Sequence, residues 1–108
     1  MVSYALVDAF TRVPREEAVE RLKHAIAVAD GVISDFAFFG REAMRLTVEL
    51  DASGLSELRR ELEGADVELL PRSAAELDSA KAMTPGRPLL ALLHVMFLPQ
   101  NSAVAAHP

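Results

Sequence analysis

Eight residues at positions 43–50, AMRLTVEL, decide the fold of this chain. From Met44 to Leu50 every second residue is aliphatic, and the residues between them are polar. Because successive side chains of a β-strand point to opposite faces of a sheet, this alternation predicts a strand with one buried face and one polar face. The expected buried side chains are Met44, Leu46, Val48 and Leu50, and the polar ones are Arg45, Thr47 and Glu49.

A partner strand precedes this segment. Residues 32–39 are rich in valine, isoleucine and phenylalanine, which are typical of strands. The two segments are separated by Gly40-Arg41-Glu42, which is typical of a turn. Residues 32–50 are therefore expected to form a β-hairpin.

One amphipathic helix is predicted before the hairpin and another after it. In the first, apolar residues recur at intervals of three and four after Pro14, whose fixed φ suits the first helical turn. Asp30-Gly31 is expected to end this helix, with the glycine in the left-handed conformation. The second helix follows residues 51–54 and ends near Gly64. The apolar stripes are Ala18, Leu22, Ala25, Ile26 and Ala29 in the first helix, and Leu55, Leu58, Leu62 and Ala65 in the second.

Further segments complete the predicted domain. Residues 3–10 predict an N-terminal strand, and residues 66–70 predict a short fourth strand. Ser73 and Glu76 form a capping-box pattern for a short third helix. Residues 89–98 predict a fifth strand that is apolar on both faces and that either extends the sheet or pairs with another chain.

The resulting order, β-α-β-β-α-β, predicts an α+β fold of the ferredoxin-like kind. The expected form is a βαββαβ sandwich with an additional short helix and a fifth C-terminal strand. Its two main helices should pack on one face of an antiparallel sheet, and strand 43–50 should lie centrally beside strand 3–10. Residues 1–98 are expected to form a single domain, and residues 99–108 a C-terminal tail.

Composition excludes several classes of protein. The 108 residues are 51% hydrophobic and 25% charged, as in ordinary globular domains, and the absence of cysteine excludes disulfides and thiolate metal sites. The formal net charge is −5 and the basic residues are interspersed with carboxylates, so no nucleic-acid partner is expected. No apolar run is long enough to span a membrane and the N-terminus lacks a basic leader, so the expected location is cytoplasmic.

The three histidines are His24, His94 and His107, and none has metal-ligand spacing from another. The isolated glycines form no phosphate-binding or dinucleotide motif, so neither a metal nor a cofactor is expected. His94 interrupts an apolar strand, where it is either a hydrogen-bonded interface residue or a general base.

The polar face of strand 43–50 is the best candidate for a binding site. Ser3, Ala5 and Ala9 of the first strand are expected beside it, and such small residues leave room for a shallow pocket, or for a cavity where two sheets meet. The alternative is a solvated face with a cross-strand ion pair. The candidate ligand-binding residues are Arg45, Thr47, Glu49, His94 and Asp8.

Strand 89–98 also predicts self-association. It is apolar on both sides, and only two or three helices are available to cover the sheet. Large exposed apolar surfaces usually mark interfaces, and two-fold pairing is the commonest arrangement. A homodimer is therefore expected, with Leu90, Leu92, Met96 and Leu98 at its interface.

The first strand reaches Asp8, and a helix ends at Asp30-Gly31 before a hairpin, so that residues 3–71 resemble the ACT domains. These are small ferredoxin-like modules that bind amino acids or similar effectors and usually pair. The family usually carries a glycine in the turn after the first strand, where this chain has FTRVP at residues 10–14. The same order is also similar to the dimeric α+β barrel proteins, in which two sheets face each other around a cavity.

The resemblance to ACT domains implies a non-catalytic small-molecule-binding or regulatory module that acts as a homodimer and senses a small metabolite. Two alternatives remain. One is a small dimeric α+β barrel enzyme that uses His94, or Arg45 with Glu49, as acid or base in a cavity between the two sheets. The other is a domain that only mediates protein association.

Overall fold

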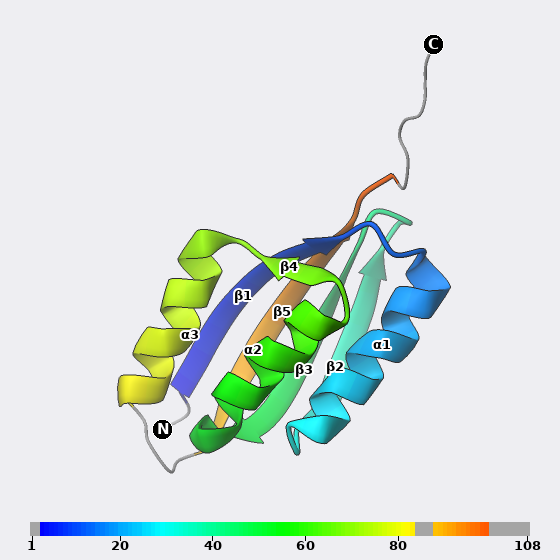
Figure 1. Ribbon diagram of the computed structural model, residues 1–108. Coiled ribbons are helices and arrows are strands. Elements are labelled where there is room, and N and C mark those ends of the chain that lie inside the picture. Colours follow the sequence, from blue (N-terminus) through cyan, green and yellow to red (C-terminus); the bar gives the residue numbers. More distant parts are fainter. Residues whose placement is uncertain (1–2, 84–87, 100–108) are drawn as a thin grey trace.

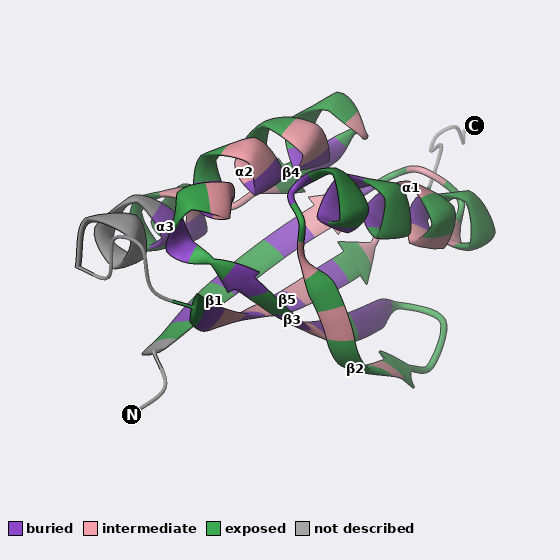
Figure 2. Cartoon of the chain, turned by 90° about the horizontal axis from the view of Figure 1, so that it is seen from below, coloured by how far each residue is buried: buried purple, intermediate pink, exposed green. Residues whose placement is uncertain are grey.

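The computed structural model describes residues 3–83 and 88–99, which form a mixed α+β domain of two layers (Figure 1). One layer is a five-stranded sheet, and the other consists of helices that all cover the same face of that sheet (Figure 2). Among the described residues, no helix is long and apolar enough to cross a membrane. In chain order the elements are β1 (Ser3–Thr11), α1 (Arg15–Val28), β2 (Val32–Phe39), β3 (Ala43–Asp51), the 3₁₀ helix η1 (Ala52–Gly54), α2 (Leu55–Gly64), β4 (Val67–Leu69), α3 (Pro71–Met83) and β5 (Pro88–Phe97).

The structure confirms the alternation of buried and exposed residues that was predicted for residues 43–50. The aliphatic residues of β3, from Met44 to Leu50, are buried beneath the helices, whereas Arg45 and Glu49 are exposed on the other face. Each buried aliphatic side chain contributes roughly 1.5–3 kcal/mol relative to exposure. The predicted hairpin is also confirmed, because β2 pairs with β3 in antiparallel fashion.

The helical stripes predicted from the three- and four-residue spacing are confirmed as well. The predicted stripe residues of α1 and α2 are buried and pack against the helix-facing side chains of the central strands, except that Ala65, just after α2, is half-buried. On the strands these core residues are Ala5, Val7, Ala9, Met44, Leu46, Val48, Leu50, Leu89, Ala91, Leu93 and Val95.

The strand order is β2-β3-β5-β1-β4, and it corrects the predicted place of the fifth strand. β5 does not extend the sheet at an edge, because it lies in the middle, parallel to β1 and antiparallel to β3. A strand that is apolar on both faces is best placed there, since both of its hydrogen-bonding edges are paired and Leu93 and Val95 are completely buried. β3 is therefore flanked by β2 and β5, not by β1. The α+β class stands, but the ferredoxin-like strand arrangement is not confirmed.

The two faces of β1 correct the expected surroundings of Arg45. Ala5 and Ala9 are fully buried on the face that carries the helices, so they do not lie beside Arg45. Tyr4 and Leu6 lie on the opposite face and are 58% and 57% exposed. Small alanines allow the helix layer to approach β1 closely, which is why they occupy the covered face. The side chain of Ser3 lies outside the described part of the chain.

Two helix boundaries also differ from the predictions. At the end of α1 the left-handed residue is Asp30, with φ of 62°, and not Gly31. Gly31 is required for a different reason, because a Cβ atom there would lie 2.9 Å from Cγ1 of Val48. α3 begins at Pro71, since proline suits a first helical turn, and Ser73 is consequently inside the helix.

Ser73 joins α3 to β1 beyond the end of the short strand β4. Its buried hydroxyl accepts a hydrogen bond from the backbone N–H of Asp8, 2.6 Å away. Ser73→Ala leaves this N–H without its partner, and we expect the free energy of unfolding in urea to fall by about 1–3 kcal/mol. Ser34→Ala removes an exposed hydroxyl and is expected to change that free energy by less than about 0.5 kcal/mol. Equal losses in the two variants would contradict a structural role for the Ser73 hydroxyl.

Candidate binding site on the open sheet face

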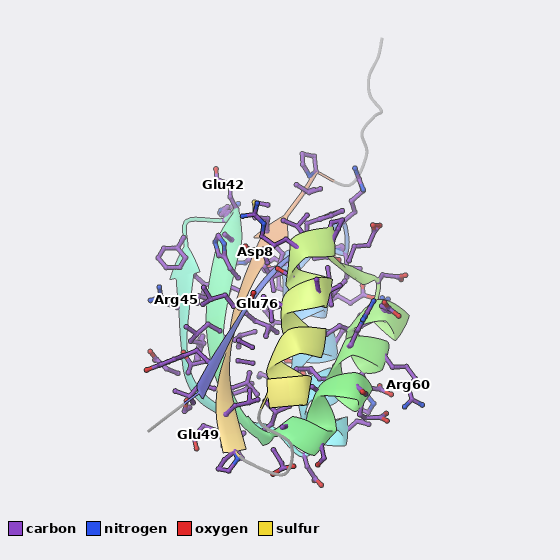
Figure 3. The ribbon with its side chains drawn as sticks, turned by 90° about the vertical axis from the view of Figure 1, so that its left-hand side faces the viewer. Asp8, Glu42, Arg45, Glu49, Arg60 and Glu76 are labelled. Carbon is purple, nitrogen blue, oxygen red and sulfur yellow. The ribbon has the colours of Figure 1, made fainter. Side chains whose placement is uncertain are left out.

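The side of the sheet that carries no helix is called the open face here (Figure 2). Arg45 and Glu49 project from the sheet on this side, whereas Arg60 of α2 projects on the opposite side (Figure 3). The register of the strands arranges the open-face side chains in rows that run across β3, β5 and β1. In order along the strands, the rows are Glu49, Leu90 and Tyr4; Thr47, Leu92 and Leu6; Arg45, His94 and Asp8; and Ala43, Met96 and Phe10.

Arg45, His94 and Asp8 form the polar row. Each residue is the cross-strand neighbour of the next, with His94 in the middle. The Nδ1 atom of His94 lies 3.5 Å from Oδ1 of Asp8, and the two side chains are 45% and 55% exposed. At this exposure the contact is screened by water, and it is an ion pair only when the imidazole is protonated. Both groups therefore remain accessible to a ligand.

Phe39 of β2 packs against the other end of the polar row. The guanidinium carbon of Arg45 lies 5.4 Å from the centre of the Phe39 ring, which is within the range of a cation-π contact. The same ring meets the imidazole of His94 edge to face, with 6.3 Å between the ring centres. Among the described residues no carboxylate forms an ion pair with Arg45. Its N–H donors are therefore oriented by an aromatic ring but not neutralised.

A depression of about 380 Å³ lies over the polar row. Leu6 and Leu92 contribute apolar walls, while Asp8, His94 and Arg45 contribute the polar groups. Small-molecule sites are commonly of this kind, with apolar walls and a few convergent polar groups that orient the ligand.

The structure places all five predicted ligand-binding residues on the open face but brings only three of them together. Asp8, His94 and Arg45 are adjacent, and the half-buried Thr47 lies one row away. Glu49 lies four residues from Arg45 along β3, a separation of about 13 Å in a strand. Arg45 and Glu49 therefore do not form the acid-base pair that the sequence analysis considered.

The open face carries more apolar surface than the sequence analysis expected. Leu90, Leu92 and Met96 of the predicted dimer interface lie on it, whereas Leu98 follows the end of β5. Four further residues of this surface were not predicted from the sequence. They are Tyr4, Leu6, Val32 and Phe39, which are 58%, 57%, 62% and 47% exposed. The alternation in β1 could have found Tyr4 and Leu6, but it does not reveal which face the helices cover.

The remaining histidines add no metal site. His24 is exposed on α1, and His107 lies outside the described residues, as does most of the predicted tail. The described part of the chain holds no group of three or more His, Asp or Glu side chains that could bind a metal ion.

A second depression, of about 500 Å³, lies beside Arg21 where α1, β1 and β4 meet. Arg21 forms ion pairs with Glu17 and Asp66, and it also donates a hydrogen bond to the carbonyl oxygen of Ala65 at 3.1 Å. The hydrogen bonds to Glu17 and then to Asp66 raise the pKa of Arg21 above its ordinary value. Two carboxylates thus neutralise this guanidinium, and Arg21 ties α1 to the turn before β4.

Comparisons of the chain with protein-family models, with curated proteins and with solved structures find no match. The chemistry of the open face therefore has to be derived from its own residues.

Proposed function

We propose that this protein is a non-catalytic binding or regulatory module that acts as a homodimer and holds a small metabolite on its open sheet face. The observation that carries the proposal is the polar row of Arg45, His94 and Asp8, beside which Leu6, Leu92 and Phe39 line the same depression. Charged groups in such a setting give a ligand orientation, while the apolar walls contribute contact area.

The polar row suits amino acids and small organic acids. The planar guanidinium of Arg45 matches a carboxylate, and the carboxylate of Asp8 matches an ammonium group. The imidazole of His94 between them donates or accepts a hydrogen bond. Leu6, Leu92 and Phe39 then contact the carbon skeleton of the ligand.

An ACT-like role is part of the same proposal. If β5 is set aside, the remaining order is β2-β3-β1-β4, which is the split βαβ arrangement of ferredoxin-like domains. In this view β5 is an insertion between β3 and β1, and it supplies His94 at the centre of the site.

Ligand binding is tested by thermal-shift screening with amino acids and small acids, followed by calorimetry on those that raise the melting temperature. Arg45→Ala removes the carboxylate-binding group and is expected to weaken binding about tenfold or more, since tenfold corresponds to about 1.4 kcal/mol. Arg60→Ala is the matched control, because Arg60 lies on the helix side and pairs with Glu57. No shift with any of these ligands, or equal losses in the two variants, would contradict the proposal.

The contact between Asp8 and His94 favours an enzyme as the second candidate. A carboxylate beside an imidazole is the arrangement that orients a general base. Prolonged incubation with each ligand that binds, followed by NMR of the ligand, separates the two functions. Recovery of unchanged ligand supports a binding module, whereas conversion that His94→Gln abolishes supports an enzyme.

A further inference from the structure

Large apolar side chains on the open face are exposed to solvent. Val32, Tyr4 and Leu6 are each more than half exposed, at 62%, 58% and 57%, and Phe39 and Met96 continue the surface at 47% and 38%. They lie on β1, β2 and β5, and no described helix packs on this side. Exposed apolar side chains gathered on one face of a domain point to an interface.

We infer that a second copy of this chain covers the open face, with the two sheets stacked face to face about a two-fold axis that runs parallel to β5. This geometry rests on the homodimer in the proposed function and specifies it. β5 is the third of five strands, so an axis along it superposes the whole of both sheets. β3 then lies over the partner's β1, and β2 over the partner's β4. Sheets stacked in this way pack about 10 Å apart.

The charges of the polar row are complementary about this axis. Arg45 lies one strand to one side of His94, and Asp8 lies one strand to the other side, in the same row. A two-fold axis along β5 exchanges the two sides and leaves the rows in register. It therefore places Arg45 over the partner's Asp8 and Asp8 over the partner's Arg45, which forms two equivalent ion pairs between the copies. The two imidazoles of His94 face each other at the axis.

Two positions of the other in-plane axis do not fit these charges. A two-fold axis that runs across the strands through the polar row would place Arg45 over the partner's Arg45 and Asp8 over the partner's Asp8. Displacing that axis by half a row would lay both charges on the row of Thr47, Leu92 and Leu6. Like charges in contact, and a carboxylate buried against Leu6, both oppose association. A cross-strand axis through the row of Thr47, Leu92 and Leu6 would instead place Arg45 over the partner's Glu49 and Asp8 over the partner's Tyr4. A dimer that Arg45→Asp weakens and Asp8→Arg does not would indicate that axis and overturn the axis along β5.

The row of Glu49, Leu90 and Tyr4 is also complementary to itself about the axis along β5. Glu49 and Tyr4 lie on either side of Leu90, and both are exposed. The same rotation places the carboxylate of Glu49 over the partner's Tyr4, whose hydroxyl can donate a hydrogen bond to it. A guanidinium has five N–H donors, so in this dimer Arg45 can bind the partner's Asp8 and a ligand carboxylate together, whereas Asp8 is engaged by the partner's Arg45 and not by a ligand ammonium group.

Charge reversal tests the geometry, with molar mass measured by light scattering and sedimentation at micromolar concentration. The wild-type chain is expected to be a dimer. Arg45→Asp places like charges opposite each other twice, and so does Asp8→Arg, so each variant alone is expected to weaken the dimer about tenfold or more. In an equimolar mixture of the two variants, the heterodimer regains both ion pairs. A chain that carries both substitutions regains both ion pairs in its homodimer. Arg60→Asp, on the helix side, is expected to leave the dimer unchanged.

Each outcome decides something different. A wild-type monomer overturns this inference and the homodimer in the proposed function together. If the wild-type chain and both reversed variants are all dimers, the axis along β5 is wrong but the homodimer stands. The same conclusion follows if the mixture stays monomeric although circular dichroism shows that both variants are folded. Recovery of the dimer on mixing supports the inference, because a contact within one chain cannot be repaired by a second chain. The binding of amino acids and acids by the wild-type chain is scored separately by calorimetry.

Discussion

Leu46→Asp is expected to abolish folding. Leu46 is 3% exposed at the centre of β3 and packs beneath the helices. The substitution forfeits roughly 1.5–3 kcal/mol of apolar burial. Burying an unpaired carboxylate costs several kcal/mol more. Domains of this kind have about 5–15 kcal/mol of total stability, so circular dichroism should show loss of the cooperative thermal transition.

Thr47→Asp is the matched control for this prediction. Thr47 is the next residue of β3, and it lies half-buried on the open face. An aspartate there is expected to cost about 1 kcal/mol through its poor strand propensity and to leave a cooperative transition. If Leu46→Asp kept a normal transition, the assignment of the buried face of β3 would be wrong.

A Gly→Ala substitution adds one methyl group. Among such substitutions, Gly54→Ala is expected to lower the free energy of unfolding most. A Cβ atom at residue 54 would lie 2.8 Å from the carbonyl oxygen of Ala29, and a backbone atom at the end of α1 cannot move aside easily. The backbone of Gly54 is in the right-handed helical region, so the conformation itself tolerates alanine. The loss therefore comes from overpacking, and we expect about 1–3 kcal/mol in urea titrations.

Gly64→Ala provides the contrast. Gly64 ends α2, and no heavy atom lies within 4 Å of the position that its Cβ would occupy. Alanine there restricts the unfolded chain more than glycine does, so a gain of about 0.4–1 kcal/mol is expected. A loss at residue 64 equal to that at residue 54 would show that helix-end glycines matter for their flexibility and not for the close contact.

Much of the fold could be predicted because its signals are local. The spacing of Leu22 and Ile26 identifies the buried side of α1, and the alternation around Leu46 identifies the buried side of β3. Both are properties of neighbouring residues in one element. Arg45, Thr47 and Glu49 were chosen on the same basis, and they lie on the open face as expected. His94 and Asp8 were chosen for other reasons, and only the strand register places them beside Arg45.

The position of β5 could not be predicted in this way. Its sequence is apolar on both sides, which is compatible with the middle of a sheet and with an interface between two chains. The expected pairing of β3 with β1 was wrong because β5 inserts between them and supplies hydrogen bonds to both. Ala5 and Ala9 were assigned to the polar side for the same reason, since the phase of β1 relative to β3 depends on the strand between them.

The amino-acid order settles which residues of this protein form helices and strands, and which side chains of each element share a face. It does so because those periodicities arise from the geometry of a single backbone segment. Packing settles the lateral order of the strands. That order in turn brings Asp8, near one end of the chain, into the same row as His94, near the other end. Hydrogen bonds between distant segments and burial of the apolar face of β5 determine which strands become neighbours, and neither can be read from one segment alone.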